Sequence, residues 1–180
     1  GKGTVIKSAQ IQDSYIGQYC KIGGEVSQSV IQSYSNKAHF GYVGDSIIGE
    51  WCNLGAGTTT SNLKLNYNSI SSSINGNKVD TKQQFLGTVT GDFVKTGIHT
   101  SLDCGSVIGC GSSLFGSTSH DRFIPDFSWG QPNEYRIHQP DALIQSIQHM
   151  KSRRGVDFLD DEIDTLKQLH TSISKIESIG

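Results

Sequence analysis

The residues best able to do chemistry lie together in one stretch, residues 35–64. Within it His39 is followed three positions later by Tyr42, and Asn53 and Asn62 come after them. If adjacent turns of the chain bring these side chains together, one titratable base stands beside hydrogen-bonding amides. Such a group could serve acyl transfer to an amine. An imidazole has an ordinary pKa of about 6.5, so it can accept a proton near neutral pH and pass it on.

Short phrases of one aliphatic residue followed by glycine indicate the elements that must position this stretch. Several recur six residues apart, namely Ile16-Gly17 with Ile22-Gly23 and Ile48-Gly49 with Leu54-Gly55, and the aliphatic residues Leu102, Ile108 and Leu114 keep the same spacing. A hexapeptide repeat is typical of a β-solenoid, in which each short strand of a triangular coil contributes one inward aliphatic residue. Glycine is favoured at the corners because it accepts a positive φ. Roughly 120 residues at three hexads per coil predict about six coils.

Composition limits the other classes of protein. The 180 residues include 21 Gly and 3 Pro and carry a net charge of −2. No run approaches the roughly 20 apolar residues that a membrane-spanning helix needs, and we expect no secretory signal. The balanced charge predicts neither nucleic acid nor a membrane surface as a partner. The 4 cysteines lie far apart without zinc-type spacing, which predicts neither a metal site nor a disulfide framework and favours a cytoplasmic location.

Residues 64–85 interrupt the hexapeptide pattern. Asn75-Gly76 lies between Ile74 and Val79, a combination that favours a hairpin, so we expect a loop that projects from one coil. The chain also begins in the middle of a hexad, at residues 1–6, with no polar capping segment before it. Because the ends of a solenoid need caps, this start predicts a further domain upstream.

The C-terminal part has a helical pattern. Pro140 suits the first position of a helix, and the acidic residues at 160–164 favour a second helix that ends near Ile176. We expect these helices to pack on the solenoid or on a neighbouring subunit. The chain is thus predicted to be an all-β, parallel β-helix of hexapeptide repeats over residues 1–130, with a C-terminal helical extension over residues 131–180.

Two phrases in the polar stretch resemble a known family. His39-x-x-Tyr42-x-Gly44-Asp45 and residues 53–58 are similar to the active-site phrases of the acetyltransferase domain in bifunctional enzymes that acetylate glucosamine 1-phosphate and then uridylylate the product. Residues 91–98 resemble the archaeal and Bacteroidetes-type branch of these enzymes. The resemblance implies a left-handed β-helix, a homotrimer with its cleft between subunits, acetyl-CoA as co-substrate, and a sugar-1-phosphate nucleotidyltransferase domain upstream.

The resemblance also implies a role for each matched residue. His39 corresponds to the catalytic base, which would take a proton from the sugar ammonium as its nitrogen attacks the thioester. Tyr42 and Asn53 correspond to residues that contact the sugar phosphate. The positions that correspond to contacts with acetyl-CoA are Ala56, Asn62, Leu63, Ile98 and Gly116.

The lysines that hold the sugar phosphate in this family are absent at their usual positions, which here are Asn68 and Ser71. Lys64, or Lys78 with Lys82, would then have to supply the charge. If none does, we expect poor affinity for the phosphate, and two alternatives follow: the acceptor is another amino sugar, or the site is degraded. A guanidinium suits the geometry of the coenzyme A phosphates, and the candidates are Arg122, Arg136, Arg153 and Arg154. The interpretation of these four residues as solvated surface charges is favoured over that role.

Structural interpretations of the same residues stay open. A lone histidine is usually a surface residue or a satisfied core residue, and Tyr42 could be an aromatic at a corner. Asn53 and Asn62 could be stacked asparagines that cap solenoid turns. A β-sandwich with glycine turns is the alternative fold, although its strands should alternate for longer.

Two other functions stay open as well. A zinc hydratase of the carbonic anhydrase type is built on the same solenoid, but it needs three convergent histidines. The candidates His39, His99 and His120 lack the short spacing that would place two of them on neighbouring corners. The other alternative is a non-catalytic trimerising or regulatory module of a sugar nucleotidyltransferase, which should tolerate substitution of His39.

Overall fold

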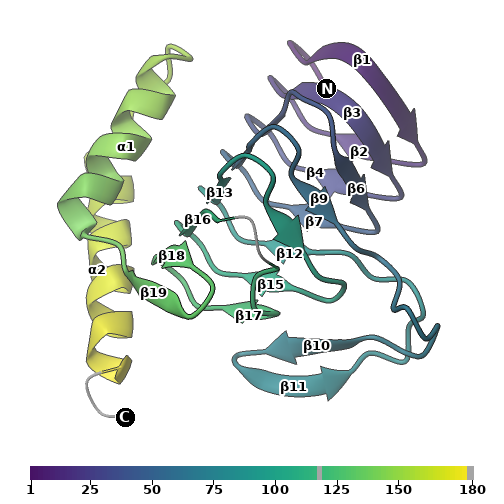
Figure 1. The fold of residues 1–180 in the computed structure, drawn as a ribbon. Helices are drawn as coiled ribbons and strands as arrows, with labels where there is room; N and C mark the ends of the chain where they lie inside the picture. Colours follow the sequence, from purple (N-terminus) through teal and green to yellow (C-terminus); the bar gives the residue numbers. More distant parts are fainter. Residues whose placement is uncertain (117–118, 178–180) are drawn as a thin grey trace. The chain divides into compact units, whose positions relative to one another are not determined.

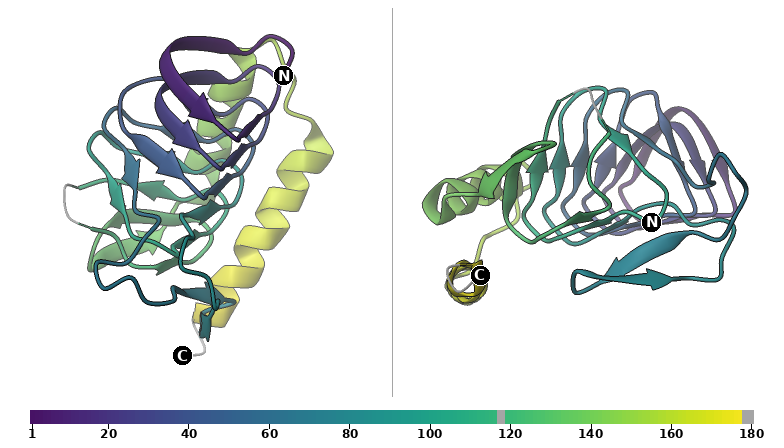
Figure 2. Two further views of the ribbon diagram at one scale, coloured as in Figure 1. Left: turned by 90° about the vertical axis from the view of Figure 1, so that its right-hand side faces the viewer. Right: turned by 60° about the horizontal axis from the view of Figure 1, so that its bottom comes forward.

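The chain folds into two compact units, residues 1–135 and the residues from 136 onward. The computed structural model describes residues 1–116 and 119–177, with residues 174–177 described by backbone alone. The first unit is a solenoid of parallel strands with about 7 turns, here called coils (Figure 1). Figure 2 shows the stacked coils from two further sides. The predicted parallel β-helix is confirmed.

Three walls of paired strands run along the solenoid. The first wall consists, in spatial order, of β1 (Val5–Gln12), β3 (Lys21–Ser27), β5 (Asn36–Lys37), β8 (Asn53–Leu54), β13 (Lys95–Thr96), β16 (Ser113–Leu114) and β18 (Ser128–Gln131). The second wall contains the later residues of β1 and β3, then β6 (Tyr42–Gly44), β9 (Thr59–Thr60) and β14 (Ser101–Leu102). The third wall consists of β2 (Tyr15–Ile16), β4 (Val30–Ile31), β7 (Ile47–Ile48), β12 (Val89–Thr90), β15 (Val107–Ile108) and β17 (Phe123–Ile124).

Inward aliphatic residues fill the core, as the hexapeptide pattern predicts. Most of those that carried the prediction are at most 3% exposed, and they include Ile22, Leu54, Leu102, Ile108 and Leu114, whereas Ile16 in the first coils is half-buried. Burying one such side chain contributes about 1.5–3 kcal/mol relative to leaving it in water. Each coil covers the apolar interior of the next, so the stability of the solenoid comes from stacking.

The corner glycines divide into two kinds: Gly57 has the predicted positive φ, at 77°, whereas the glycines that follow an inward aliphatic residue serve another purpose. Neither Gly49 nor Gly55 has a positive φ. A Cβ on Gly49 would lie 2.4 Å from the carbonyl oxygen of Gly91 in the next coil, and a Cβ on Gly55 would be as close to that of Gly97. The positive φ belongs instead to bulky residues such as Tyr34, at 61°. Glycine is needed here because successive coils approach closely, and the prediction that it provides the turn conformation is wrong at these positions.

The solenoid has one coil more than the hexapeptide count predicts. Phe123 pairs with Val107 and Trp129 pairs with Ser113, so residues 121–131 complete a further coil. Phe123 and Trp129 stand here at outward positions where the preceding coil has Val107 and Ser113, which hides the repeat. The strand β19 (Glu134–Ile137) follows, so the segment after residue 131 is at first extended and not helical.

An antiparallel hairpin interrupts the solenoid. Its strands are β10 (Ser71–Ile74) and β11 (Asn77–Asp80), and the turn at Asn75-Gly76 has positive φ at both residues, 49° and 81°. The predicted hairpin is therefore confirmed. After it the ladder resumes in register, because Asn53 pairs directly with Lys95.

The second unit contains the helices α1 (Pro140–Ser152) and α2 (Asp160–Glu177), close to the predicted spans. The buried ammonium of Lys151 donates to the carboxylate of Glu162 over 2.6 Å, which joins the two helices. The side chain of Ile176 lies outside the described residues. Neither helix is long and apolar enough, over the residues described, to cross a membrane.

Candidate active site

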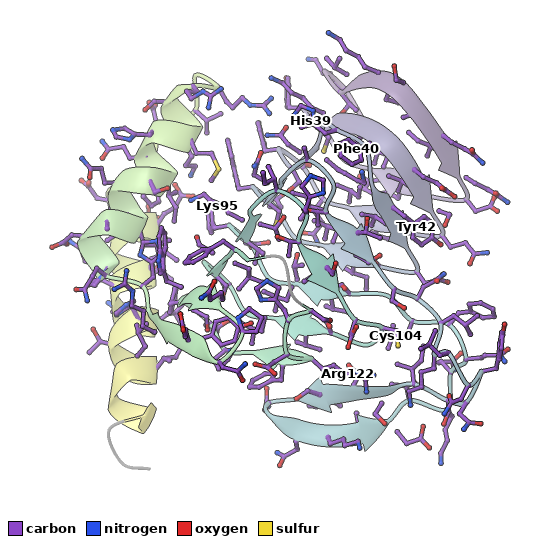
Figure 3. The ribbon with its side chains drawn as sticks, in the orientation of Figure 1. His39, Phe40, Tyr42, Lys95, Cys104 and Arg122 are labelled. Carbon is purple, nitrogen blue, oxygen red and sulfur yellow. The ribbon has the colours of Figure 1, made fainter. Side chains whose placement is uncertain are left out.

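The corner between the first and second walls carries His39. The same corner recurs in the coils that follow, at residues 55–58 and 97–100. The N–H of Gly57 donates to the carbonyl of Phe40 over 3.0 Å. The N–H of His99 donates to the carbonyl of Ala56 over 2.7 Å. His39 is exposed on this corner (Figure 3), so its imidazole is open to a ligand that lies along the stacked corners.

Exposed apolar side chains continue along the same corner. Phe40, Ile98 and Phe115 are 62%, 69% and 39% exposed, and together they are called the apolar ridge here. The ring of Phe40 lies 5.8 Å from that of His99. Adjacent exposed apolar groups mark a surface that binds a ligand or another chain. The structure brings three of the predicted acetyl-CoA positions to this corner, namely Ala56, Ile98 and Gly116.

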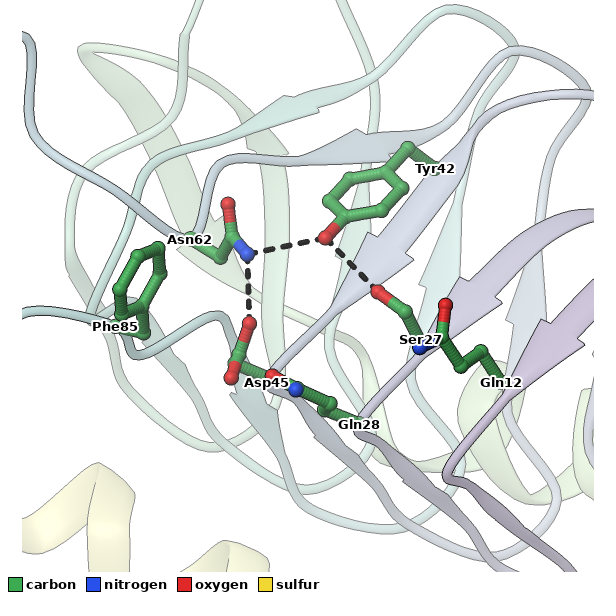
Figure 4. Close-up of a pocket in the computed structure, with 7 residues that line it drawn as sticks. All are labelled: Gln12, Ser27, Gln28, Tyr42, Asp45, Asn62 and Phe85. Carbon is green, nitrogen blue, oxygen red and sulfur yellow. Dashed lines mark hydrogen bonds between the residues drawn. The ribbon is translucent and has the colours of Figure 1, made fainter.

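Tyr42 and Asn62 meet beside the second wall, in a pocket of about 320 Å³ that is called the Tyr42 pocket here (Figure 4). The amide Nδ2 of Asn62 donates to the Tyr42 hydroxyl over 3.0 Å and to the Asp45 carboxylate over 2.6 Å. The Tyr42 hydroxyl also lies 2.9 Å from the hydroxyl of Ser27. The rest of the lining consists of Gln12, Gln28 and Phe85. The lining thus contains one carboxylate and no lysine or arginine.

Sequence reasoning missed Ser27 and the part played by Asp45 in this pocket. Ser27 lies 15 positions before Tyr42, on the coil below, and the two meet because Val26 pairs with Val43. A search for polar residues one coil apart would have found this pair. Asn62 was expected to contact acetyl-CoA, yet the structure places it with Tyr42, which was expected to contact the sugar.

Asn53 lies elsewhere, on the outer side of the first wall. Its Oδ1 accepts a hydrogen bond from Nδ2 of Asn36 over 3.4 Å. In the first wall Asn53 pairs with Lys95 of the next coil. Burial is the main cause that lowers the pKa of the Lys95 amine. The structure therefore places Asn53 in a polar row on the first wall, whereas Tyr42 is on the second.

A second pocket, of about 430 Å³, adjoins the start of the loop insertion. It is lined by Ser61, Leu63, Lys64, Leu65, Asn66, Asp103, Cys104 and Arg122. The ammonium of Lys64 donates to the carbonyl of Ser69 over 2.5 Å. Two of the predicted cations, Lys64 and Arg122, thus share one pocket. Lys78 is exposed on β11, opposite Ser73, and lines neither pocket.

Within the described ranges, no cluster of three or more His, Cys, Asp or Glu side chains could hold a metal ion. Of the histidines weighed for a zinc site, His99 lies at the corner above Gly57. His120 is buried elsewhere, where its Nδ1 lies 2.6 Å from the hydroxyl of Tyr135. No step of the chemistry considered below involves a metal.

Parallel strands in stacked three-walled coils, with one inserted loop, define the class of this protein as a left-handed parallel β-helix. Comparison with solved structures agrees. The chain superposes on a variant of AntD, an N-acyltransferase from Bacillus cereus in complex with dTDP-4-amino-4,6-dideoxyglucose and coenzyme A, with a TM-score of 0.59. The match has 19% identity and covers 84% of this chain and 89% of that one. It supports the fold.

Sequence comparison is more specific. Over 134 residues the chain is 38% identical to the bifunctional protein GlmU of Methanococcus vannielii, and this match covers 74% of this chain and 30% of that protein. Over 97 residues it is 34% identical to the bifunctional sugar-1-phosphate nucleotidylyltransferase/acetyltransferase of Sulfurisphaera tokodaii, and this match covers 53% of this chain and 24% of that protein. No protein-family model matches. The expected resemblance to these bifunctional proteins is confirmed, and the chain spans less than a third of their length.

Proposed function

We propose that this chain is an N-acetyltransferase that moves the acetyl group of acetyl-CoA to the amine of an amino sugar. The observation that supports this most directly is the placement of two groups by one short segment. Residues 39–42 carry an exposed imidazole on the corner and, on the adjoining wall, a tyrosine hydroxyl set in a polar pocket. Acyl transfer to an amine needs a base that works near neutral pH and polar groups that hold the acceptor.

The chemistry assigned to His39 is general base and then general acid catalysis. The imidazole takes a proton from the acceptor ammonium, and the freed amine attacks the thioester carbonyl. The C–N bond forms in this attack, which gives the tetrahedral intermediate, and the C–S bond breaks when that intermediate collapses. The proton returns from the imidazolium to the departing thiolate of coenzyme A, so His39 ends the cycle neutral, and a second proton leaves the nitrogen to solvent as the amide forms. A well-placed base of this kind contributes typically about 10²–10⁴-fold to the rate.

The apolar ridge suits the donor. The pantetheine arm of acetyl-CoA is long and only partly polar, and Phe40, Ile98 and Phe115 offer it an exposed apolar track beside His39. The backbone at Ala56 and Gly116 lies on the same corner and has little side chain to obstruct an approaching ligand. We assign this corner to acetyl-CoA.

Glucosamine 1-phosphate is the acceptor that the resemblance implies. Its hydroxyls match the donors and acceptors of the Tyr42 pocket, but that pocket supplies no cation for the phosphate. We assign the phosphate to the second pocket, where Lys64 and Arg122 carry the positive charge. An anionic group recognised by a guanidinium forms short, charge-assisted hydrogen bonds.

A homotrimer is part of this proposal. Every outward residue along the third wall is apolar, and the row consists of Tyr15, Val30, Ile47, Val89, Val107 and Phe123. Tyr15 is 62% exposed and Ile47 is 46% exposed. A continuous apolar row on a folded domain favours contact with another chain.

The test is release of free coenzyme A from acetyl-CoA with glucosamine 1-phosphate near pH 7.5. We expect turnover by the wild-type chain and its loss in His39→Ala. His149→Ala, which removes an exposed histidine of α1, is the matched control and should retain full activity. A folded chain without turnover on any amino sugar would contradict the proposal and favour a non-catalytic trimerising module.

A further inference from the structure

The corner that carries His39 is longer than the corner beneath it. Ile22 pairs with Lys37, and Glu25 pairs with Tyr42. Between these two pairs the lower coil has only residues 23–24, whereas the upper coil has residues 38–41. The additional residues must project from the solenoid, so the segment that presents His39 lacks a matching backbone below it.

A lysine fills the space under this projecting segment. Lys37 occupies an inward position of the first wall, in register with the core residue Ile22, and is 2% exposed. Its amine donates to the carbonyl of Gly23 over 3.1 Å and to the carbonyl of His39 over 2.9 Å. One side chain therefore ties the backbone of His39 to the coil below.

The surrounding backbone leaves room for this amine. Gly24 has a φ of 71°, and a Cβ at that residue would lie 2.9 Å from both the Lys37 amine and the His39 carbonyl. Only glycine fits there without displacing one of the two groups. Burial lowers the pKa of Lys37 to about 8. Both the ammonium and the neutral amine have at least two N–H donors, so either form can satisfy both carbonyls.

An apolar residue would fit an inward position at lower cost, since burying an amine is unfavourable unless hydrogen bonds compensate. Here one of the two compensating bonds goes to the backbone carbonyl of His39, whose imidazole the proposed chemistry needs. We propose that Lys37 is a positioning residue, which holds the backbone of His39 so that the imidazole meets the acceptor amine. This inference rests on the proposed acetyl transfer.

The experiment compares wild type with Lys37→Met, which keeps the length and apolar stem of the side chain and removes the amine. Lys21→Met, at an exposed lysine one residue from Ile22 on the same wall, is the control. We expect kcat of Lys37→Met to fall on the order of 10²-fold, as a misplacement near 1 Å can cause. KM for acetyl-CoA should stay unchanged. Tm should change little, because the cost of burying an amine is removed while the carbonyls of Gly23 and His39 lose a donor, and these two effects oppose each other.

Two further readouts separate positioning from a merely structural role. In a His39→Ala background, Lys37→Met should cost nothing more, since its effect acts through His39. Hydrogen exchange should quicken at the amides of Glu25 and Gly57, which donate to the carbonyls of Gly41 and Phe40. The amide of Val30 on the third wall should not change.

The proposal is overturned if Lys37→Met keeps its kcat, if it fails to fold or loses Tm in proportion to activity, or if its effect adds to that of His39→Ala. Absence of turnover in the wild-type chain would instead count against the proposed function. If the wild-type chain shows no turnover, hydrogen exchange at the amides of Glu25 and Gly57 still tests whether Lys37 holds the corner. Unchanged exchange in Lys37→Met would overturn the positioning role.

Discussion

The side-chain amide of Asn62 donates to the hydroxyl of Tyr42 over 3.0 Å, although the two residues lie 20 positions apart. The same amide donates to the carboxylate of Asp45, and the Tyr42 hydroxyl is hydrogen-bonded to the hydroxyl of Ser27 on the coil below. The loop insertion starts just after Asn62. One amide therefore connects two coils of the solenoid to the base of the inserted loop, at the place assigned to the acceptor.

Tyr42→Phe should weaken acceptor use while leaving the fold intact. The substitution leaves the Asn62 amide and the Ser27 hydroxyl without a shared partner, and a lost hydrogen bond of this kind is worth about 0.5–1.5 kcal/mol. We expect kcat/KM for the acceptor to fall roughly three- to tenfold, with KM for acetyl-CoA unchanged. Tyr15→Phe, at an exposed tyrosine, is the control, and equal losses in both variants would contradict the assignment.

Arg122→Met should discriminate between acceptors with and without a phosphate. If the second pocket holds the phosphate, KM for glucosamine 1-phosphate rises about tenfold while KM for glucosamine is unchanged, because only the former loses a charge-assisted bond. Steady-state kinetics with both acceptors measures this. Arg153→Met, at an exposed arginine of the second unit, serves as control. A rise in KM for acetyl-CoA alone would show that Arg122 serves the coenzyme.

Ile47→Asp should dissociate the proposed trimer. The substitution places a carboxylate in the middle of the apolar row of the third wall, where association would have to bury it unpaired. Light scattering after size exclusion should show trimer for wild type and monomer for the variant. Ile74→Asp, at an isoleucine that is 62% exposed on the hairpin, should remain trimeric. A trimeric Ile47→Asp would mean that another wall forms the interface.

Stability should fall as the pH drops below about 6.5, in part because of His120. Burial is the main cause that lowers the pKa of this imidazole, and nearby Asp121 opposes the shift. The folded state therefore keeps His120 neutral at a pH where the unfolded chain already binds a proton. Its contribution is complete above the unfolded pKa of about 6.5 and is lost as the pH falls toward the folded value.

Urea unfolding at pH 7.5 and pH 5.5 measures this effect. His120→Gln keeps a polar partner for the Tyr135 hydroxyl but cannot titrate, so its free energy of unfolding should change less with pH, by up to about 1.4 kcal/mol per unit of pKa shift. His149→Gln should behave as wild type does. An unchanged pH dependence in His120→Gln would assign the effect to other groups.

Much of the fold could be predicted because the solenoid repeats at short range. Ile22, Leu54 and Ile108 reveal their inward positions by spacing alone. The last coil was missed because Phe123 and Trp129 stand where the preceding coil has Val107 and Ser113, so the period is present in the backbone but not in the residue types.

The candidate site was predictable only in part. Residue types identified His39 and Tyr42, but the contacts of Tyr42 depend on which coil lies below it. The pairing of Val26 with Val43 sets the register between these two coils. The corner before this pair is longer in the upper coil than in the lower one, and no spacing rule in the sequence shows that difference. For the same reason Lys37, which reads as an ordinary strand lysine, gave no sign that its amine lies beneath His39.

The inserted loop leaves the register of the solenoid untouched. Leu54 pairs with Thr96 just as Thr96 pairs with Leu114, although the segment between the first two contains the whole hairpin. The inserted loop is therefore exchangeable, because its length and sequence can vary without shifting any strand of the three walls. Grafting a loop from another β-helix between Thr60 and Gly87 would be a direct way to redesign what this scaffold accepts, with the corner at His39 left as it is.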